Sequence, residues 1–220
     1  MKSWDPIWDN VFLNQEWGKY PSESVIQFIA RNFYKKDRKA IKILEVGCGT
    51  GANIWFISRE GFQTYGIDGS SVAIDVATKR LAAEGLTSNL ICGDISSLPY
   101  ETETFDAVID VECLYANNRT STERILEEIK RVLKRNGKFF SRTFSDKMYL
   151  GQFYEELTAL EYTNSSDGPL AGKGFTRLSN RESIREIYGA VFNIESVDTL
   201  DYTSHDGGVT ISEFIIVASK

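Results

Sequence analysis

The sequence predicts an α/β fold built on a doubly wound parallel sheet that ends in an antiparallel hairpin. Residues 41–46 form an apolar run typical of a strand buried on both faces, and a glycine turn and a helical stretch at 52–60 follow it. Strand-like and helix-like stretches then alternate along the chain. The last two strand-like stretches, 192–202 and 209–218, are separated only by a turn, which favours antiparallel pairing.

The N-terminal region is predicted to form two helices joined by an irregular segment. Apolar residues recur at helical spacing across 4–12 and again across 25–33. We expect the aromatic stripe of the first helix to be ordinary core cover. The connecting segment 17–21 contains glycine and proline, so Trp17 and Tyr20 are awkward there as core residues. We therefore expect these two aromatic residues to fold over a ligand.

The central part of the chain is predicted to continue the alternation of strands and helices. A helix at 72–84 follows a cap at Ser70 or Ser71. Another helix begins with a capping box at 120–123 and continues to a stop at 136–137. The strands expected beside these helices are 63–68, 89–92, 105–110 and 138–145.

Beyond residue 145 the pattern loosens before a final helix and hairpin. Apolar residues across 148–157 favour a short helix, and 164–174 has the composition of a loop. A capping box at 179–182 predicts a helix that continues to residue 190. A long connection inside a compact domain is usually functional. We therefore expect this segment to shape the side of the site that receives a substrate.

We interpret the chain as a single domain with four parts. With 220 residues, of which 42% are hydrophobic and 25% charged, it is long enough for one well-filled core. No internal repeat is evident. The four parts are an N-terminal helical cap (1–40), a ligand-binding core (41–145), a substrate-side insertion (146–180) and a C-terminal helix and hairpin (181–220).

Composition and charge argue against several classes of protein. The formal net charge of −6 disfavours a nucleic-acid partner, because such binding depends on Lys and Arg that neutralise phosphates. The sequence shows no signal peptide and no apolar stretch long enough to cross a bilayer, so we expect a cytoplasmic protein without membrane contact. Cys48, Cys92 and Cys113 are odd in number and widely spaced, so we expect reduced thiols and no metal site.

The turn after the first predicted strand carries three glycines at alternate positions. Gly47, Gly49 and Gly51 lack the Cβ atoms that would keep a ligand away from the backbone. Their spacing alone does not separate a nicotinamide cofactor from other adenosine-containing ligands. Asp68 ends the second strand, the position of an acid that accepts hydrogen bonds from ribose hydroxyls. No Arg follows Asp68 directly, which disfavours a phosphorylated dinucleotide.

The residues around this turn resemble a known family. Leu-Glu-Val-Gly-Cys-Gly-Thr-Gly at 44–51 is similar to the first motif of the class I S-adenosylmethionine-dependent methyltransferases. The strand at 105–110 and the residues 111–115 also resemble the part of that family that lies beside the reacting methyl group. The resemblance covers 41–145 and implies a Rossmann-like seven-stranded sheet. It further implies S-adenosylmethionine as cofactor, a small metabolite methylated at oxygen or nitrogen, and S-adenosylhomocysteine as product.

This resemblance and the rule for open α/β sheets place the cofactor beyond the carboxyl ends of the strands. We expect Asp68 to bind the ribose, Asp94 to accept from the adenine amino group, and Glu45 to receive the ammonium group. Cys48 is expected to line the pocket as a small side chain. The predicted cofactor-binding residues are Trp17, Tyr20, Glu45, Gly47, Cys48, Gly49, Gly51, Asp68, Gly69, Ser70, Asp94, Ile95, Asp110, Val111 and Tyr115.

Methyl transfer from a sulfonium needs alignment and a proton acceptor rather than a metal or a nucleophilic side chain. Glu112 follows the fourth strand and is a candidate to orient the acceptor or take its proton. His205 is the only histidine, and histidine is the residue type best suited to accept a proton near neutral pH, although a histidine in a glycine-rich hairpin is more often an exposed turn residue. Tyr149 and Arg177 are further candidates for substrate contact, and Arg177 would suit an acidic acceptor.

Two other functions remain open. A nicotinamide-dependent oxidoreductase should carry a proton relay such as Tyr-x-x-x-Lys, and neither Tyr115 nor Tyr149 is followed by lysine at that spacing. A non-catalytic S-adenosylmethionine-binding protein would keep the pocket and use its aromatic helices to hold a protein partner. The sequence does not identify the methyl acceptor or the oligomeric state.

Overall fold

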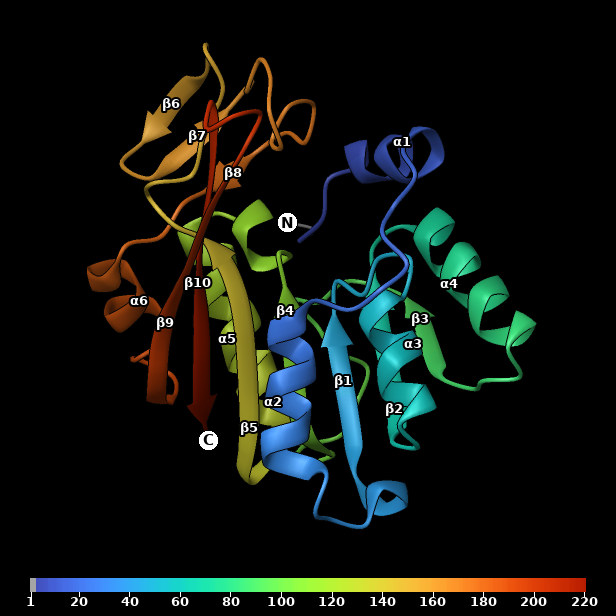
Figure 1. Cartoon of the computed structure of the whole chain (residues 1–220). Helices are drawn as coiled ribbons and strands as arrows, with labels where there is room; N and C mark the ends of the chain where they lie inside the picture. Colours follow the sequence, from blue (N-terminus) through green and yellow to red (C-terminus); the bar gives the residue numbers. More distant parts are fainter. Residues whose placement is uncertain (1–2) are drawn as a thin grey trace.

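A sheet of seven strands forms the centre of the fold (Figure 1). The computed structural model describes residues 3–220. The strands of this sheet are β1 (Lys42–Val46), β2 (Gln63–Asp68), β3 (Asn89–Cys92), β4 (Phe105–Val111), β5 (Leu133–Phe144), β9 (Asn193–Ser204) and β10 (Val209–Ser219). Their order is β3-β2-β1-β4-β5-β10-β9, with β1 to β5 parallel and β10 antiparallel to both β5 and β9. The predicted doubly wound sheet with an antiparallel terminal hairpin is confirmed.

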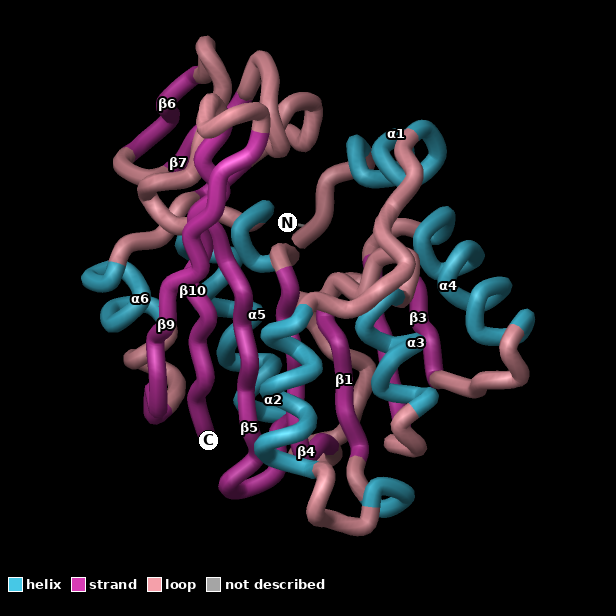
Figure 2. The backbone as a smooth tube through the Cα atoms, viewed as in Figure 1, coloured by secondary structure: helices cyan, strands magenta, loops and turns pink. Residues whose placement is uncertain are grey.

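Helices cover both faces of this sheet (Figure 2). The covering helices are α2 (Glu23–Phe33), α3 (Ala52–Arg59), α4 (Ser71–Ala83), α5 (Arg119–Val132) and α6 (Arg181–Ile187), whereas α1 (Ile7–Asn14) lies elsewhere. On one face Phe28 of α2 belongs to the same apolar cluster as Ile43, and on the other Ile129 of α5 belongs to the cluster of Leu44. Adjacent residues of β1 are therefore buried on opposite faces, as its continuous apolar run predicts. Within residues 3–220, none of the helices has the length and apolar character needed to span a bilayer.

The first helix lies beyond the carboxyl ends of the parallel strands rather than against the sheet (Figure 1). Its Phe12 ring lies above Gly49 of the turn after β1. Its Trp8 packs on an apolar cluster that contains Tyr115 and Leu170, the latter from the insertion. Helix α1 therefore bridges the glycine turn and the insertion across the top of the sheet.

The short helix predicted within 148–157 is wrong, because this part of the insertion leads into a small antiparallel sheet. Its strands are β6 (Glu155–Thr158), β7 (Glu161–Thr163) and β8 (Thr176–Arg177), in the order β6-β7-β8. Gly151 has a φ of +105°, which no helix accommodates. The carboxylate of Asp167 accepts a hydrogen bond from the backbone N–H of Gln152 at 2.7 Å. A contact from a distant segment thus overrides the local apolar spacing.

The starts of the two later sheet-covering helices differ from the predicted capping boxes. Helix α5 begins after Asn118, whose side chain accepts from the N–H of Ser121 at 2.9 Å, so the box predicted at 120–123 is wrong. Helix α6 begins after Asn180, which forms a reciprocal box with Ser183, so the box predicted at 179–182 is wrong. In both cases an asparagine satisfies the free amides of the first turn.

Two further helix boundaries were predicted, the end of α5 and the start of α4. Helix α5 ends at Val132, before the predicted stop at 136–137, because Leu133 already pairs with Phe105 of β4. Of the two caps predicted for α4, Ser70 or Ser71, the structure has Ser70, since its Oγ accepts from the N–H of Ala73 at 3.2 Å.

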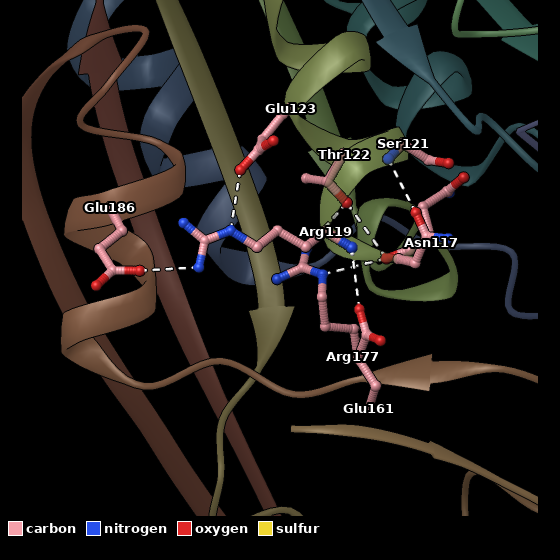
Figure 3. A network of polar contacts seen from close by, with 9 residues as sticks. Asn117, Arg119, Ser121, Thr122, Glu123, Glu161, Arg177 and Glu186 are labelled. Carbon is pink, nitrogen blue, oxygen red and sulfur yellow. Dashed lines mark hydrogen bonds and ion pairs between the residues drawn. The ribbon is translucent and has the colours of Figure 1, made fainter. Parts of the chain in front are cut away.

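A polar network joins the insertion to the N-terminus of α5 (Figure 3). The buried guanidinium of Arg177 donates from Nε to the carbonyl of Asn117 at 3.1 Å and from Nη2 to Thr122 Oγ1 at 3.3 Å. The backbone N–H of Arg119 donates to Glu161 Oε1 at 3.0 Å. These bonds fix the small sheet relative to the core, so the insertion is anchored at this end.

Candidate functional site

A cavity of about 380 Å³ lies at the carboxyl ends of β1, β2 and β4. The turn after β1, the residues that follow β2 and β4, the N-terminal segment and one lysine of the insertion form its walls. The predicted site residues that line it are Trp17, Tyr20, Glu45, Gly47, Cys48, Gly49, Asp68, Gly69, Ile95, Val111, Glu112 and Tyr115. The topology thus gathers most of the predicted site into one hollow, as the rule for open sheets requires.

The glycine turn is left-handed at all three glycines, with φ of +66° at Gly47, +49° at Gly49 and +79° at Gly51. A Cβ on Gly47 would collide with the side chain of Cys113. A Cβ on Gly51 would lie 2.9 Å from Ala77, so this glycine allows α3 and α4 to pack and does not line the cavity. Gly47 and Gly49 present bare backbone to the hollow, as predicted.

Asp68 ties the end of β2 to this turn. Its carboxylate accepts from the N–H of Gly49 and from the N–H of Ser70, both at 2.8 Å. Burial raises its pKa, and the two backbone donors oppose that effect. The Asp68 side chain borders the cavity while Ser70 is fully buried behind it. The oxygens of Asp68 keep lone pairs that can accept from a ligand hydroxyl.

Glu45 is a buried carboxyl group at the cavity floor. Its Oε1 accepts from Asn53 Nδ2 at 2.6 Å, while Oε2 is buried without a hydrogen-bond partner in the part of the chain that the structure describes. Burial, reinforced by Asp68 and Asp110, raises its pKa to about 8. An unsatisfied buried oxygen that borders a cavity is a natural receptor for a donor or cation brought by a ligand.

Two of the predicted acids stand behind the wall of the cavity. Asp94 accepts from the N–H and Oγ of Ser3 and from Ser96; burial raises its pKa, but these bonds bring it below the ordinary value. Asp110 accepts from Ser141 Oγ at 2.6 Å and from the N–H of Cys113 at 3.0 Å, and burial raises its pKa to about 6. Neither borders the hollow. Asp110 therefore positions the turn after β4 from behind.

Aromatic side chains of the N-terminal segment roof the cavity. The ring of Phe12 lies 5.3 Å from that of Trp17 and 5.9 Å from that of Trp8. Trp4 lies against Gly69, where a Cβ would collide with its ring. Trp8 packs against a buried apolar cluster, as expected of core cover, but both Trp4 and Trp8 also line the cavity. Their position reflects a helix that sits over the strand ends instead of on the sheet.

A charged corner of the cavity combines three elements. Glu112 follows β4 and has a φ of +53°. Arg142 of β5 reaches it at 3.5 Å and also pairs with Glu213 of β10. Lys173 enters from the insertion with its ammonium 5.0 Å from the centre of the Trp17 ring, and burial lowers its pKa. Sequence reasoning missed Arg142, Lys173 and Glu213, since sheet order and the insertion place them here.

The other candidates for catalysis or substrate contact lie away from this cavity. His205 is exposed at the tip of the β9–β10 hairpin, where Ser204 Oγ lies 3.1 Å from its Nδ1. Tyr149 donates to Asp167 at 3.0 Å, and Arg177 is occupied by the network at α5. The structure does not bring these three side chains to the cavity.

Comparisons with known proteins agree with this arrangement. Residues 43–137 match a family model described as a methyltransferase domain. The chain is 28% identical over 169 residues to the probable phthiotriol/phenolphthiotriol dimycocerosates methyltransferase 2 of Mycobacterium ulcerans (strain Agy99), covering 76% of this chain and 59% of that protein. It is 33% identical over 115 residues to the demethylmenaquinone methyltransferase of Tropheryma whipplei (strain Twist), covering 51% and 46%.

A solved structure shares the fold. An S-adenosylmethionine-dependent methyltransferase of Methanosarcina mazei superimposes with a TM-score of 0.71 at 21% identity, covering 83% of this chain and 93% of that one. The chain spans only 59% and 46% of the two curated relatives, so each extends well beyond the matched part.

Proposed function

We propose that this chain, which belongs to the class I S-adenosylmethionine-dependent methyltransferases, transfers a methyl group to an oxygen or nitrogen of a small metabolite. The product of the cofactor would be S-adenosylhomocysteine. The observation that carries the proposal is the juxtaposition, around one hollow, of the Gly47–Gly49 backbone, the Asp68 carboxylate and Glu45 Oε2, which has no hydrogen-bond partner among residues 3–220. When bound, S-adenosylmethionine supplies a methyl group already activated by its positively charged sulfur.

The residues present fit this cofactor. Glu45 offers a buried oxygen without a partner in residues 3–220, which suits an ammonium group. Asp68 suits ribose hydroxyls, and the bare turn at Gly47 and Gly49 lets a ligand approach the backbone. The Trp4 ring packs against Gly69, directly after Asp68, and lines the cavity, so it offers a flat aromatic surface that suits an adenine ring. The glycine turn is flanked by the carboxylates of Glu45 and Asp68, and Arg142, which also lines the cavity, is paired with Glu112 and Glu213. This arrangement favours an adenosine without phosphates over a diphosphate.

The residues of the chain have three tasks in the transfer. The aromatic roof of Trp8, Phe12 and Trp17 excludes water and, with Tyr115 below, restricts the orientation of the acceptor. Glu112, half-buried at the cavity wall, takes the proton that the acceptor loses. Asp110 holds the turn that carries Glu112 through the N–H of Cys113.

The proposed acceptor is a small molecule rather than a nucleic acid. The cavity is enclosed by aromatic residues and its acidic groups outnumber the basic ones. A formal net charge of −6 supplies no broad basic surface for a polyanion.

Calorimetry tests the cofactor assignment. S-adenosylmethionine and S-adenosylhomocysteine are expected to bind and NAD is not. Asp68→Ala should weaken both by about 1–3 kcal/mol, because a buried acceptor is lost. Asp75→Ala, an exposed acid on α4, is the matched control and should leave binding unchanged. Tight binding of NAD, or no binding of either sulfur ligand, would contradict the assignment.

A screen of small methyl acceptors tests turnover. S-adenosylhomocysteine should accumulate with at least one compound that carries a nucleophilic oxygen or nitrogen. Binding of the cofactor without accumulation across the screen would favour the non-catalytic alternative.

A further inference from the structure

The guanidinium of Arg142 forms ion pairs with two carboxylates at the charged corner of the cavity. Arg142 Nη2 lies 2.5 Å from Glu213 Oε2, and Arg142 Nε lies 3.5 Å from Glu112 Oε1. The three side chains come from β5, from β10 and from the turn after β4. Pairing of β5 with both β4 and β10 in the sheet therefore creates the cluster.

The two carboxylates differ in access to the cavity. The Glu213 side chain is 1% exposed and its Oε1 is buried without a hydrogen-bond partner within residues 3–220. The Glu112 side chain is 33% exposed and, like Arg142, it lines the cavity, whereas Glu213 does not. A ligand can therefore reach Glu112, and Glu112 and Arg142 separate Glu213 from it.

The charges of the cluster do not balance when both acids are ionised. Two carboxylates against the one guanidinium of Arg142 leave a net negative charge beside the buried Glu213, which is costly, and burial disfavours the charged form of Lys173, the second cation of this corner. Burial and the neighbouring Glu112 raise the pKa of Glu213 to about 7. Tyr202 of β9 also faces the cluster, and burial and Glu213 raise its pKa. Lys173 enters from the insertion side, where burial lowers its pKa and the neighbouring Glu112 opposes that effect.

We infer that Glu112 and Glu213 form a coupled carboxylate pair that takes up one proton between them, in which Glu112 receives the proton of the methyl acceptor and Glu213 is the positioning residue that tunes this uptake. The inference rests on the proposed function. In the transfer, a lone pair on the acceptor oxygen or nitrogen forms the bond to the methyl carbon, and the carbon–sulfur bond breaks with its electrons going to sulfur. The acceptor proton passes to Glu112, and the doubly ionised pair becomes singly protonated.

Carbon-13 NMR of the whole protein, labelled at the glutamate side-chain carboxyls, tests the coupling without any acceptor. The Glu213 signal is identified by its loss in Glu213→Gln, and Glu45 is identified in the same way with Glu45→Gln. Glu213 should titrate near neutral pH in the native protein. In Glu112→Gln its proton affinity should fall about tenfold or more, because a like charge has been removed.

The matched control is Glu195→Gln, which alters a glutamate of the same sheet that pairs with Lys138. It should leave the Glu213 titration unmoved. Should Glu213→Gln fail to fold, the signal is identified instead by its loss in Glu213→Asp, because an aspartate does not carry the glutamate label. The inference is overturned if the midpoint pH of the Glu213 titration is the same in Glu112→Gln as in the native protein, or if that midpoint lies in the ordinary range of a glutamate.

The pH profile of kcat, measured with an acceptor found in the screen, shows whether Glu213 adjusts the proton affinity of the pair or only supports the structure. The native rate should rise with pH to a plateau, and Glu213→Gln should move the acidic limb to lower pH, whereas Glu213→Asp should restore it. An equal loss of kcat at every pH would mean that Glu213 is only structural. If S-adenosylhomocysteine binds but the coupling is absent, the inference alone fails; if S-adenosylhomocysteine does not bind, the proposed function fails and the NMR result still stands.

Discussion

The amide of Asn53 and the carboxyl group of Glu45 face each other at the floor of the cavity, with Asn53 Nδ2 2.6 Å from Glu45 Oε1. Asn53 stands in the first turn of α3 and Glu45 in β1, so the bond spans the glycine turn. It satisfies one carboxyl oxygen and leaves the other directed at no partner in the described chain. The turn is thus braced on one side and open to a ligand on the other.

Glu45→Gln should change how stability depends on pH. The folded-state pKa of Glu45 is raised from 4.5 to about 8, so the folded protein binds more protons than the unfolded chain between these values. Native stability should therefore fall as pH rises from 5 to 8, relative to Glu45→Gln, by on the order of 2–4 kcal/mol. Urea unfolding of both proteins at pH 5 and pH 8 measures this difference. A pH dependence that is the same in the two proteins would contradict it.

Gly47→Ala should destabilise the protein and abolish binding of S-adenosylhomocysteine. The new Cβ would meet Cys113 in a left-handed backbone conformation. The matched control is Gly61→Ala, where φ is +86° and nothing lies within 4 Å of the new Cβ. We expect about 1 kcal/mol of destabilisation from backbone strain alone in the control and clearly more in Gly47→Ala. Thermal unfolding and calorimetry distinguish the two, and equal effects would argue against crowding by Cys113.

Arg177→Met should destabilise the protein by about 2 kcal/mol or more, because it strips the carbonyl of Asn117 and Thr122 of a buried charged donor. Arg119→Met removes a side chain from the same network that is 53% exposed, so its cost should stay below about 1 kcal/mol. Denaturant unfolding provides both values. Since Arg177 lies outside the cavity, calorimetric binding of S-adenosylhomocysteine should be unaffected; weaker binding would show that the insertion reaches the cofactor.

His205→Asn should leave methyl transfer unchanged across the pH range. The imidazole is exposed at a hairpin tip, remote from the cavity-lining Glu112. Initial rates with an acceptor from the screen provide the measurement, and Glu112→Gln in parallel should lower kcat by about 10²-fold or more. If the fall of the rate at low pH disappears in His205→Asn, His205 rather than Glu112 would be the proton acceptor.

The sequence by itself determined the sheet, its parallel core with a terminal hairpin, and the turn at Gly47 that borders the cavity. These features are local: apolar runs specify buried strands, and left-handed turns require glycine, so neighbouring residues suffice to predict them. The Ser70 cap and the position of Asp68 at the end of β2 follow from the same short-range rules.

Only the tertiary structure decided which side chains meet in the cavity. Sheet order set Arg142 between Glu112 and Glu213, which are far apart in the sequence, and Asp167 prevented the helix that the spacing around Gly151 suggests. The aromatic stripe of α1 has the same pattern whether it covers a core or a cavity, because amphipathic spacing records that one face is covered but not what covers it.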